Sequence, residues 1–425
     1  MLGSYVLIGS ILLGQAAPAA DDALRLEVRR LVRQLDAPQL AERDAAEEKL
    51  LGMGPKVLEL LPPADDRTSA EVLQRLERIR QRLYRNLAEA AAQVSRVTLR
   101  GDAMELSKIL AALEEQTGNK IIDDRAHGGA RGADPELKVD FDKTPFWQAL
   151  DHVLEQANLT FYPYGEEKAI RVVPRPEGED RRASRPSYCG PLRIEAVHVT
   201  AKRDLRSAKE GALMLGVQIA WEPRLAPISF LVSMADVSAL DDQGNSLAIA
   251  TRDAQLEVPV ESDRMAKELI IPLALPPRSV KEIATLKGSF TALVPGKVET
   301  LRFKDLAKIK QQEQRLPGAT VTLDEVRKGA KLWEVRLRLR LDQPGEALQS
   351  HRNWIFENEA YLEGADGKRL DYGTYETTRQ KKDEVGIAYL FRPKGELSDY
   401  TFVYKTAGLV LPMQYTYELH HLKLP

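Results

Sequence analysis

The pattern of apolar positions divides the chain into a helical part, a mixed part and a long strand-rich part. From residue 21 to about residue 95, apolar side chains recur every three or four positions, as the buried face of a helix requires. Proline and glycine breaks separate four helical stretches there, at 36–38, 52–55 and 62–63. After residue 188 apolar and polar residues alternate instead, which is the pattern of half-buried strands.

A repeat lies between these two parts, from Val97 to Pro174, with a shift of 40 residues. Each copy has a short alternating strand, an amphipathic helix, a Gly or Asn stop and a second strand. The shift relates Leu99 to Val139, Leu106 to Phe146, Leu110 to Leu150, Leu113 to Val153 and Ile121 to Phe161. We therefore expect one α/β module at residues 96–174. Its helices should lie near Leu106–Gln116 and Phe146–Gln156, on one face of a single sheet.

The last part of the chain predicts two antiparallel β-sandwich domains, at residues 188–312 and 313–425. A polar, proline-rich linker at 175–187 precedes them and should act as a movable arm. Corresponding anchors in the two halves are 112 to 123 residues apart, for example Gly244 and Gly367. A duplication is one interpretation, and the ordinary likeness of any two sandwiches is the other. The expected fold class is therefore multidomain α+β, with an N-terminal helical region, a duplicated βαβ module and two C-terminal antiparallel β-sandwich domains.

Two of these regions resemble known families. The layout of residues 96–174 resembles the secretin and TonB short N-terminal domain, a small βαβ module of bacterial envelope proteins. Within the helical region 21–95, the stretch from Leu31 to Leu61 looks like one helical pair of the HEAT or armadillo type. One such pair cannot bury both of its faces alone. The whole order is similar to that of uncharacterised exported bacterial envelope proteins, and the resemblance implies protein–protein docking.

An apolar run at Tyr5–Leu13, followed by small residues, predicts a secretory signal peptide at residues 1–20. The run is shorter than the roughly 20 residues that span a bilayer. No Lys or Arg precedes it, so a buried N-terminal helix is the alternative. We expect an exported protein, periplasmic or extracellular, with no membrane span in the mature chain.

Composition and motifs mainly argue against two functions, nucleic-acid binding and catalysis. With 61 basic and 63 acidic residues the net charge is −2, so nothing global favours nucleic acid. The catalytic motifs of serine hydrolases, zinc proteases and phosphate-binding loops do not occur, and we expect no enzymatic activity and no cofactor.

The adjacent His420 and His421 should point to opposite faces of a strand and share no metal ion. Asp123–Asp124 and Asp140/Asp142 could bind calcium or could line strand ends. Cys189, the single cysteine, is either a reactive thiol or a small apolar filler.

Two features of the C-terminal half indicate a possible binding surface, made of Arg336, Arg338, Arg340, Trp333 and Trp354. The strict alternation over Val335–Leu341 puts the three arginines on one strand face, where they meet either solvent or an anionic polymer. The last 108 residues hold 13 of the 26 aromatic residues, the two tryptophans included. These aromatic side chains either fill a core or stack on sugar rings and peptides.

Together these observations predict a non-catalytic exported envelope protein that acts as a docking or scaffold component for an envelope protein partner. One alternative is a glycan or cell-wall binding protein that uses the aromatic-rich C-terminal sandwich. Another is a hydrolase with a dispersed acid pair, which leaves no local motif. A bare strand edge would favour docking, clustered exposed aromatics would favour a glycan, and a deep acidic cleft would favour an enzyme.

Overall fold

A computed structural model describes residues 17–425 except 63–67, 126–133, 164–167, 179–184, 204–205, 207–210, 262–263, 297, 317, 330–331, 342–352, 357 and 382. The apolar run at Tyr5–Leu13 lies outside the described residues. The chain forms two compact units, Met1–Asn86 and Leu87–Pro425. Helices dominate the N-terminal part and antiparallel strands the C-terminal part, which confirms the expected multidomain α+β fold.

The first unit is helical and has its own apolar core. Its elements are α1 (Ala17–Gln34), α2 (Leu40–Gly52), the 3₁₀ turn η1 (Pro55–Val57) and α3 (Ala70–Ala92), whose last residues belong to the second unit. The core includes Leu31, Leu50 and Ile79, one from each helix. The nearly buried Arg75 guanidinium binds Asp44 at 2.8 Å and Glu47 at 2.7 Å, which joins α3 to α2. The third predicted helix is only the turn η1, because prolines bound it on both sides.

The second unit begins with the α/β module. Its elements are β1 (Arg96–Glu105), α4 (Leu106–Thr117), β2 (Ile121–Asp123), β3 (Glu136–Pro145), α5 (Phe146–Gln156), β4 (Leu159–Tyr162) and β5 (Ile170–Pro174). The helices lie where the 40-residue repeat predicts them. Gly118 and Asn158, the expected stops, both adopt the left-handed backbone conformation that ends a helix, with φ of 70° and 54°.

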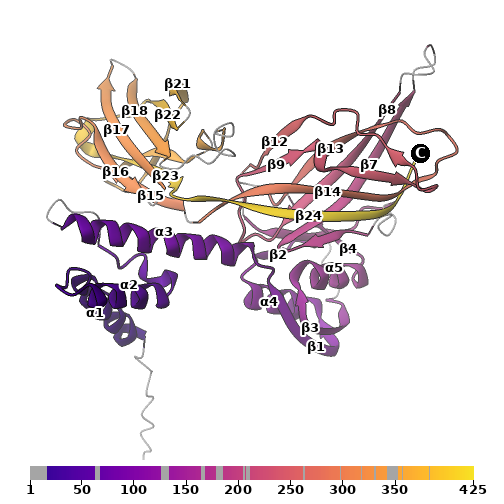
Figure 1. Ribbon diagram of the computed structural model, residues 1–425, viewed down its shortest axis with the longest axis horizontal. Helices are drawn as coiled ribbons and strands as arrows, with labels where there is room; N and C mark the ends of the chain where they lie inside the picture. The colour runs from indigo at the N-terminus through magenta and orange to yellow at the C-terminus, as the bar shows by residue number, and fades with distance from the viewer. Residues whose placement is uncertain are drawn as a thin grey trace, which may run out of the picture. The chain divides into compact units, whose positions relative to one another are not determined.

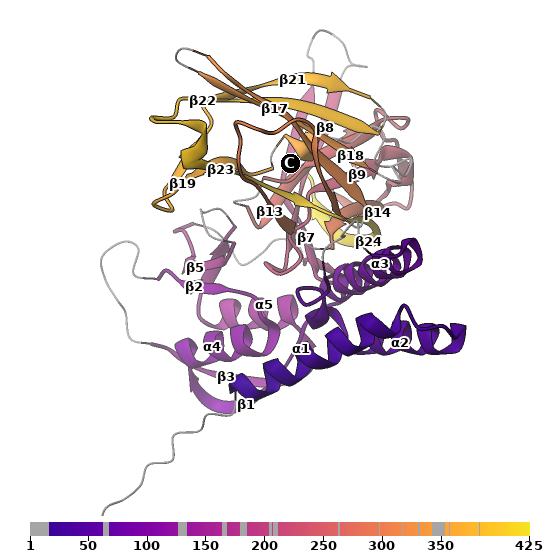
Figure 2. The ribbon, with the colours of Figure 1, turned by 90° about the vertical axis from the view of Figure 1, so that its left-hand side faces the viewer.

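The expectation of a single sheet in this module is wrong. Strand β1 pairs antiparallel with β3, the equivalent strand of the other copy, and the remaining strands form a separate sheet in the order β2-β5-β4. Helices α4 and α5 lie between the two sheets (Figures 1 and 2). Helix α5 is therefore buried on several sides, and seven of its 11 residues are buried.

The first sandwich follows. One sheet has the order β13-β8-β7-β6 and the other contains β11-β10-β14-β9-β12 with β24 beside β14. The strands are β6 (Ser187–Cys189), β7 (Leu192–Arg203), β8 (Gly211–Trp221), β9 (Ser229–Ser233), β10 (Ser238–Asp241), β11 (Ser246–Leu247), β12 (Gln255–Pro259), β13 (Ala266–Ala274), β14 (Glu282–Pro295) and β24 (Val410–Lys423), with a 3₁₀ turn η2 (Met234–Asp236).

The second sandwich also has two sheets, in the orders β15-β23-β19-β20 and β16-β17-β18-β22-β21. Its strands are β15 (Val298–Phe303), β16 (Gln312–Leu316), β17 (Ala319–Lys328), β18 (Trp333–Leu341), β19 (Ala360–Gly364), β20 (Arg369–Asp371), β21 (Thr374–Gln380), β22 (Glu384–Phe391) and β23 (Tyr400–Ala407), with 3₁₀ turns η3 (Asn353–Ile355) and η4 (Leu397–Asp399).

The division expected at residue 312 does not match the strand pairing. Strand β15, from the expected first domain, pairs with β23 in the second sandwich. The C-terminal strand β24 returns to the first sandwich and pairs with β14 over its whole length, as Figure 1 shows. Its Tyr415, Tyr417, Leu419 and Leu422 side chains belong to the first core. The sandwiches are thus joined by a two-stranded ribbon and exchange one strand each across the expected boundary.

The α/β module is not on a movable arm, because its residues pack directly on the first sandwich. The Trp147 indole on α5, only 1% exposed, donates to the Pro191 carbonyl at 3.1 Å. The Arg193 guanidinium on β7, fully buried, binds Asp151 of α5 at 2.8 Å and Glu195 at 2.8 Å. Ala220 and Ala266 of the sandwich contribute to the apolar core of the module.

A second buried polar group lies in the same interface. The Glu222 carboxylate, fully buried at the end of β8, accepts hydrogen bonds from Ser95 Oγ at 2.6 Å and from Asn119 Nδ2 at 2.9 Å. Arg224 Nε donates to the same carboxylate at 2.7 Å and neutralises its charge. Because buried charges are costly unless paired, these contacts require the module and the sandwich to stay together.

Candidate binding groove

The structure separates the five residues of the predicted binding surface. Trp333 and Trp354 are 4% and 5% exposed and lie in the core of the second sandwich, so they offer nothing to a ligand. Arg336, Arg338 and Arg340 lie on the opposite, outward face of β18. The alternation explains both results, because Trp333 shares its face with Val335, Leu337 and Leu339, all of them buried.

Two β-bulges flank this row of arginines. Leu323 of β17 is paired with Leu337 and Glu325 with Arg336, so Asp324 is an extra residue in β17. In the same way Thr378 is an extra residue in β21, between the pairs that Thr377 and Arg379 make with β22. Bulges redirect side chains and often lie beside binding sites. Here they bring Asp324 and Arg379 toward β18 from its two sides.

Gly386 of β22 makes room for the second bulge. It is paired with Arg338 on β18, and a Cβ atom at this position would lie 2.6 Å from Thr378 Oγ1 and 2.9 Å from Arg379 Cβ. Any larger residue would push the bulged strand away from β22. The absent side chain therefore lets Thr378 and Arg379 approach the arginine row.

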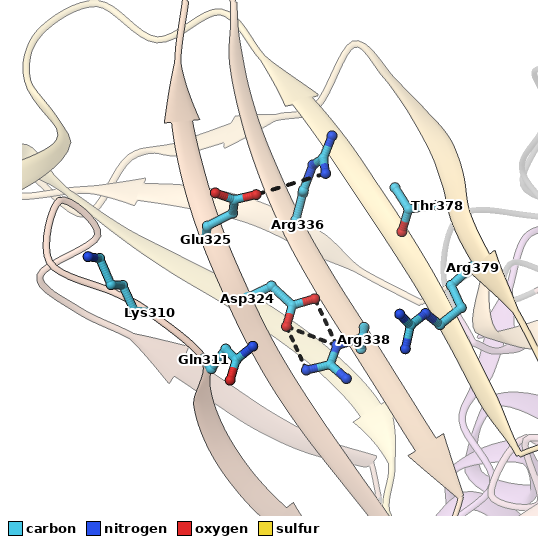
Figure 3. Close-up of a pocket in the computed structure, with 8 residues that line it drawn as sticks. All are labelled: Lys310, Gln311, Asp324, Glu325, Arg336, Arg338, Thr378 and Arg379. Carbon is cyan, nitrogen blue, oxygen red and sulfur yellow. Dashed lines mark hydrogen bonds and ion pairs between the residues drawn. The ribbon is translucent and has the colours of Figure 1, made fainter.

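The bulged residues and the arginines form a chain of ion pairs, of which Figure 3 shows Asp324 with Arg338 and Glu325 with Arg336. Asp324 holds Arg338 through hydrogen bonds of 2.7 to 2.9 Å to two of its nitrogens, and this carboxylate raises the pKa of the Arg338 guanidinium. Glu384, only 9% exposed, binds Arg379 at 2.8 Å and approaches Arg338 at 3.5 Å. The arginine forks are thus held in fixed positions on an otherwise ordinary sheet face.

Arg336 and Arg340 complete the row in different ways. Arg336 binds Glu334 at 2.7 Å and lies 3.9 Å from Glu325. Arg340 is exposed and has no ion-pair partner among the residues that the structure describes. Arg336 and Arg338 line the same pocket, so the structure brings these two of the three predicted arginines into one site.

That site is an open groove on the outer face of the sheet. A pocket of about 650 Å³ is lined by Lys310, Gln311, Asp324, Glu325, Arg336, Arg338, Thr378 and Arg379 (Figure 3). A second open pocket, of about 570 Å³, shares Lys310 and is lined by Arg302, Lys304, Asp305, Lys308, Ile309 and Gln312. We call the two pockets together the basic groove. The backbone N–H of Gln311 donates to the backbone carbonyl of Asp324 at 2.9 Å, which holds the loop between β15 and β16 beside β17.

Several groove residues could not be found from strand alternation alone. The lysines belong to a connecting loop, and the bulges at Asp324 and Thr378 interrupt the alternation. One signal did exist. Asp324 and Glu325 are two consecutive polar residues in an alternating strand, which is what a bulge produces.

The other candidate residues are engaged in local ion pairs or apolar contacts. Asp123 binds Arg125 at 2.6 Å and Asp124 binds Arg171 at 3.2 Å, which fits the strand-end interpretation better than calcium binding. His420 and His421, both exposed, approach two different carboxylates, Glu418 and Glu282. Within the described ranges, no three His, Cys, Asp or Glu side chains lie close enough together to hold a metal ion.

Cys189 packs against the first core, as the filler interpretation expects. Burial raises the pKa of its thiol to about 12. A thiol with this pKa is almost entirely protonated near neutral pH, and only the thiolate is nucleophilic. Alkylation by iodoacetamide at about pH 8 should therefore be at least about a hundredfold slower in the native protein than in denaturant. Mass spectrometry of timed samples measures both rates, and equal rates would show that the thiol is accessible and reactive.

Comparison with protein-family models, curated proteins and solved structures finds no match to this chain. None of the helices in the described parts of the chain has the length and hydropathy needed to cross a membrane.

Proposed function

We propose that the protein is an exported, non-catalytic component of the bacterial envelope that docks a protein partner in the basic groove. The observation that carries the proposal is the set of ion-paired arginines Arg336, Arg338 and Arg379, which line an open groove between two bulges. Arginine forks held in place lose little entropy when they bind a ligand, so such a surface is suited to recognition. The envelope address rests on the predicted signal peptide and on the resemblance of residues 96–174 to the secretin and TonB short N-terminal domain.

The arrangement of the groove favours docking over hydrolysis. A glycosidase-type acid pair needs one carboxyl group that stays protonated and another that stays ionised. Two of the three carboxylates that line the groove, Asp324 and Glu325, instead face the arginines Arg338 and Arg336. The groove is open and has an excess of cationic side chains, whereas an acid pair would be expected in a deep acidic cleft.

Glycan binding remains a second candidate because of one aromatic pair. The rings of Phe356 and Tyr375 stack with centroids 5.7 Å apart and planes 10° apart, and Tyr375 is 39% exposed. An exposed aromatic ring can stack on a sugar. Four other aromatics of the second sandwich, Tyr389, Phe391, Phe402 and Tyr404, cannot extend this pair on the surface because they are fully buried.

A pull-down from envelope extract tests the docking proposal. The bait is the mature chain, and the groove variant carries Lys310→Gln and Arg379→Gln, which remove two cations and the ion pair of Arg379 with the nearly buried Glu384. We expect the wild type to retain a discrete partner and the variant to retain at least about tenfold less, since each tenfold corresponds to about 1.4 kcal/mol of binding free energy.

The matched control carries Arg100→Gln and Lys138→Gln on the β1–β3 ribbon. These residues are 69% and 73% exposed and form ion pairs with Asp140 and Asp102. The control therefore makes the same change in net charge outside the groove and should retain the partner fully. Equal retention by the groove variant and the wild type would contradict docking at this site. Retention lost only on Tyr375→Ala, with a polysaccharide as the captured species, would favour the glycan candidate.

A further inference from the structure

Three lysines of the basic groove carry charges that no carboxylate of the described residues pairs with. Lys304, Lys308 and Lys310 are exposed and have no ion-pair partner among the described residues. The arginines of the groove differ, because Arg302 binds Glu363 and both Arg336 and Arg338 bind the carboxylates described above. The lysines come from one short loop between β15 and β16, and the buried Leu306 anchors that loop in the core.

The charges of the whole groove show the same excess. Seven cationic and three anionic side chains line the two pockets. Glu334, Glu363 and Glu384, which lie beside the pockets, pair with three of the arginines, so the excess of positive charge is that of the loop lysines. The chain as a whole has a net charge of −2, so this excess is local. Like charges that are close together repel one another, and a ligand of opposite charge relieves that repulsion.

The groove also opens toward the edge of its sheet. Thr378 and Arg379 line it from β21, the last strand in the order β16-β17-β18-β22-β21. In the described part of the chain β21 pairs with β22 alone, and all seven of its residues are exposed. An edge strand presents unpaired backbone N–H and C=O groups, which another extended polypeptide can pair with.

From these observations we propose that the basic groove binds an acidic polypeptide segment, which is the part of the docking partner that the protein recognises. This inference rests on the proposed function and names the chemistry of its ligand. The lysines and the fixed arginines would bind the carboxylates, and the edge of β21 would pair with the backbone. A phosphate polymer fits less well, because it has no backbone N–H and C=O groups to pair with the edge of β21.

Fluorescence anisotropy with the full mature chain tests the proposal. The probes are labelled poly-glutamate, labelled poly-lysine and labelled polyphosphate, titrated at low and at physiological ionic strength. We expect poly-glutamate to bind most tightly and to weaken as salt screens the charges. Replacing Lys304, Lys308 and Lys310 together by Glu should weaken its binding at least about tenfold.

Two further variants test whether poly-glutamate binding depends on the groove or only on the net charge of the chain. The charge-matched control replaces Lys56, Lys202 and Lys394 by Glu, three exposed lysines outside the groove with no ion-pair partner in the described residues. It should bind poly-glutamate within about twofold of the wild type. The milder variant, with Gln at the three groove lysines, should show an intermediate loss, and circular dichroism confirms that each variant is folded.

Each other outcome overturns the proposal. If both Lys→Glu variants, in the groove and outside it, weakened poly-glutamate binding equally, the binding would depend on net charge and not on the groove. Tighter binding of polyphosphate than of poly-glutamate would show that the ligand is not a polypeptide. Failure of the inference can be distinguished from failure of the proposed function. If the variant with Glu at the three groove lysines still retained an envelope partner, the inference of an acidic segment would be wrong and the docking proposal would stand. If the groove bound poly-glutamate but the chain retained no envelope partner, the docking proposal would be wrong and the preference for acidic polypeptide would stand.

Discussion

A chain that ends after Val410 should lose its first sandwich and keep its second. The deleted residues form almost all of β24, which makes 13 residue pairs with β14. Four large apolar side chains would leave the first core, those of Tyr415, Tyr417, Leu419 and Leu422. At about 1.5–3 kcal/mol for each buried side chain, the loss is about 6–12 kcal/mol. That is as large as the whole stability of a typical domain, about 5–15 kcal/mol.

Hydrogen exchange with mass spectrometry measures this outcome strand by strand. In the truncated chain the amides of β14 and β8 should exchange at the rate of unfolded peptide, whereas those of β18 and β22 should stay protected. Val410, which packs in the second core, is retained so that this sandwich keeps its contacts. The control removes only Leu424 and Pro425, beyond the last pair of β24. The opposite pattern, with β14 protected and β18 exchanging, would support the boundary expected at residue 312.

This strand exchange marks the limit of what the sequence could predict about the fold. The helices α4 and α5 end within one residue of the expected positions, because helix periodicity and the stops at Gly118 and Asn158 are local signals. Strand partners are not local. An alternating strand such as β24 can pair with any strand that offers a free edge, and β14 lies more than 100 residues away. The same reason explains why β1 pairs with β3 rather than within its own copy.

Only those residues of the site that follow the local alternation of a strand could be predicted from the sequence. Alternation correctly put Arg336 and Arg338 on the outward face, and the same rule puts Trp333 on the inner one. Asp324 and Arg379 join the site only through bulges, which depend on how the four strands β17, β18, β22 and β21 are aligned. The loop lysines join it because the folded chain brings the loop beside β17. No spacing within the sequence encodes these approaches.

The second large effect is expected at the interface between the α/β module and the first sandwich, where Arg193→Met should cost about 3–5 kcal/mol of stability. The substitution leaves Asp151 and Glu195 in the interface without their cation. Asp151 accepts from Arg193 Nε at 2.8 Å and from the Tyr188 hydroxyl at 2.7 Å, and its side chain is 6% exposed. The matched control, Arg100→Met, breaks an ion pair with Asp140 that is largely exposed, and should cost no more than about 1 kcal/mol.

The double variant Arg193→Met with Asp151→Asn separates the buried charge from the lost contact. Since much of the cost comes from the carboxylates that remain buried, neutralising Asp151 should restore part of the stability that Arg193→Met removes. Urea unfolding followed by exchange of the α5 and β7 amides measures whether the module and the sandwich lose protection together, as a shared interface requires. If Arg193→Met and Arg100→Met cost the same, or if only the module loses protection, the polar contacts do not hold the two together. The module would then be free to move relative to the sandwich, as the polar linker at 175–187 suggests.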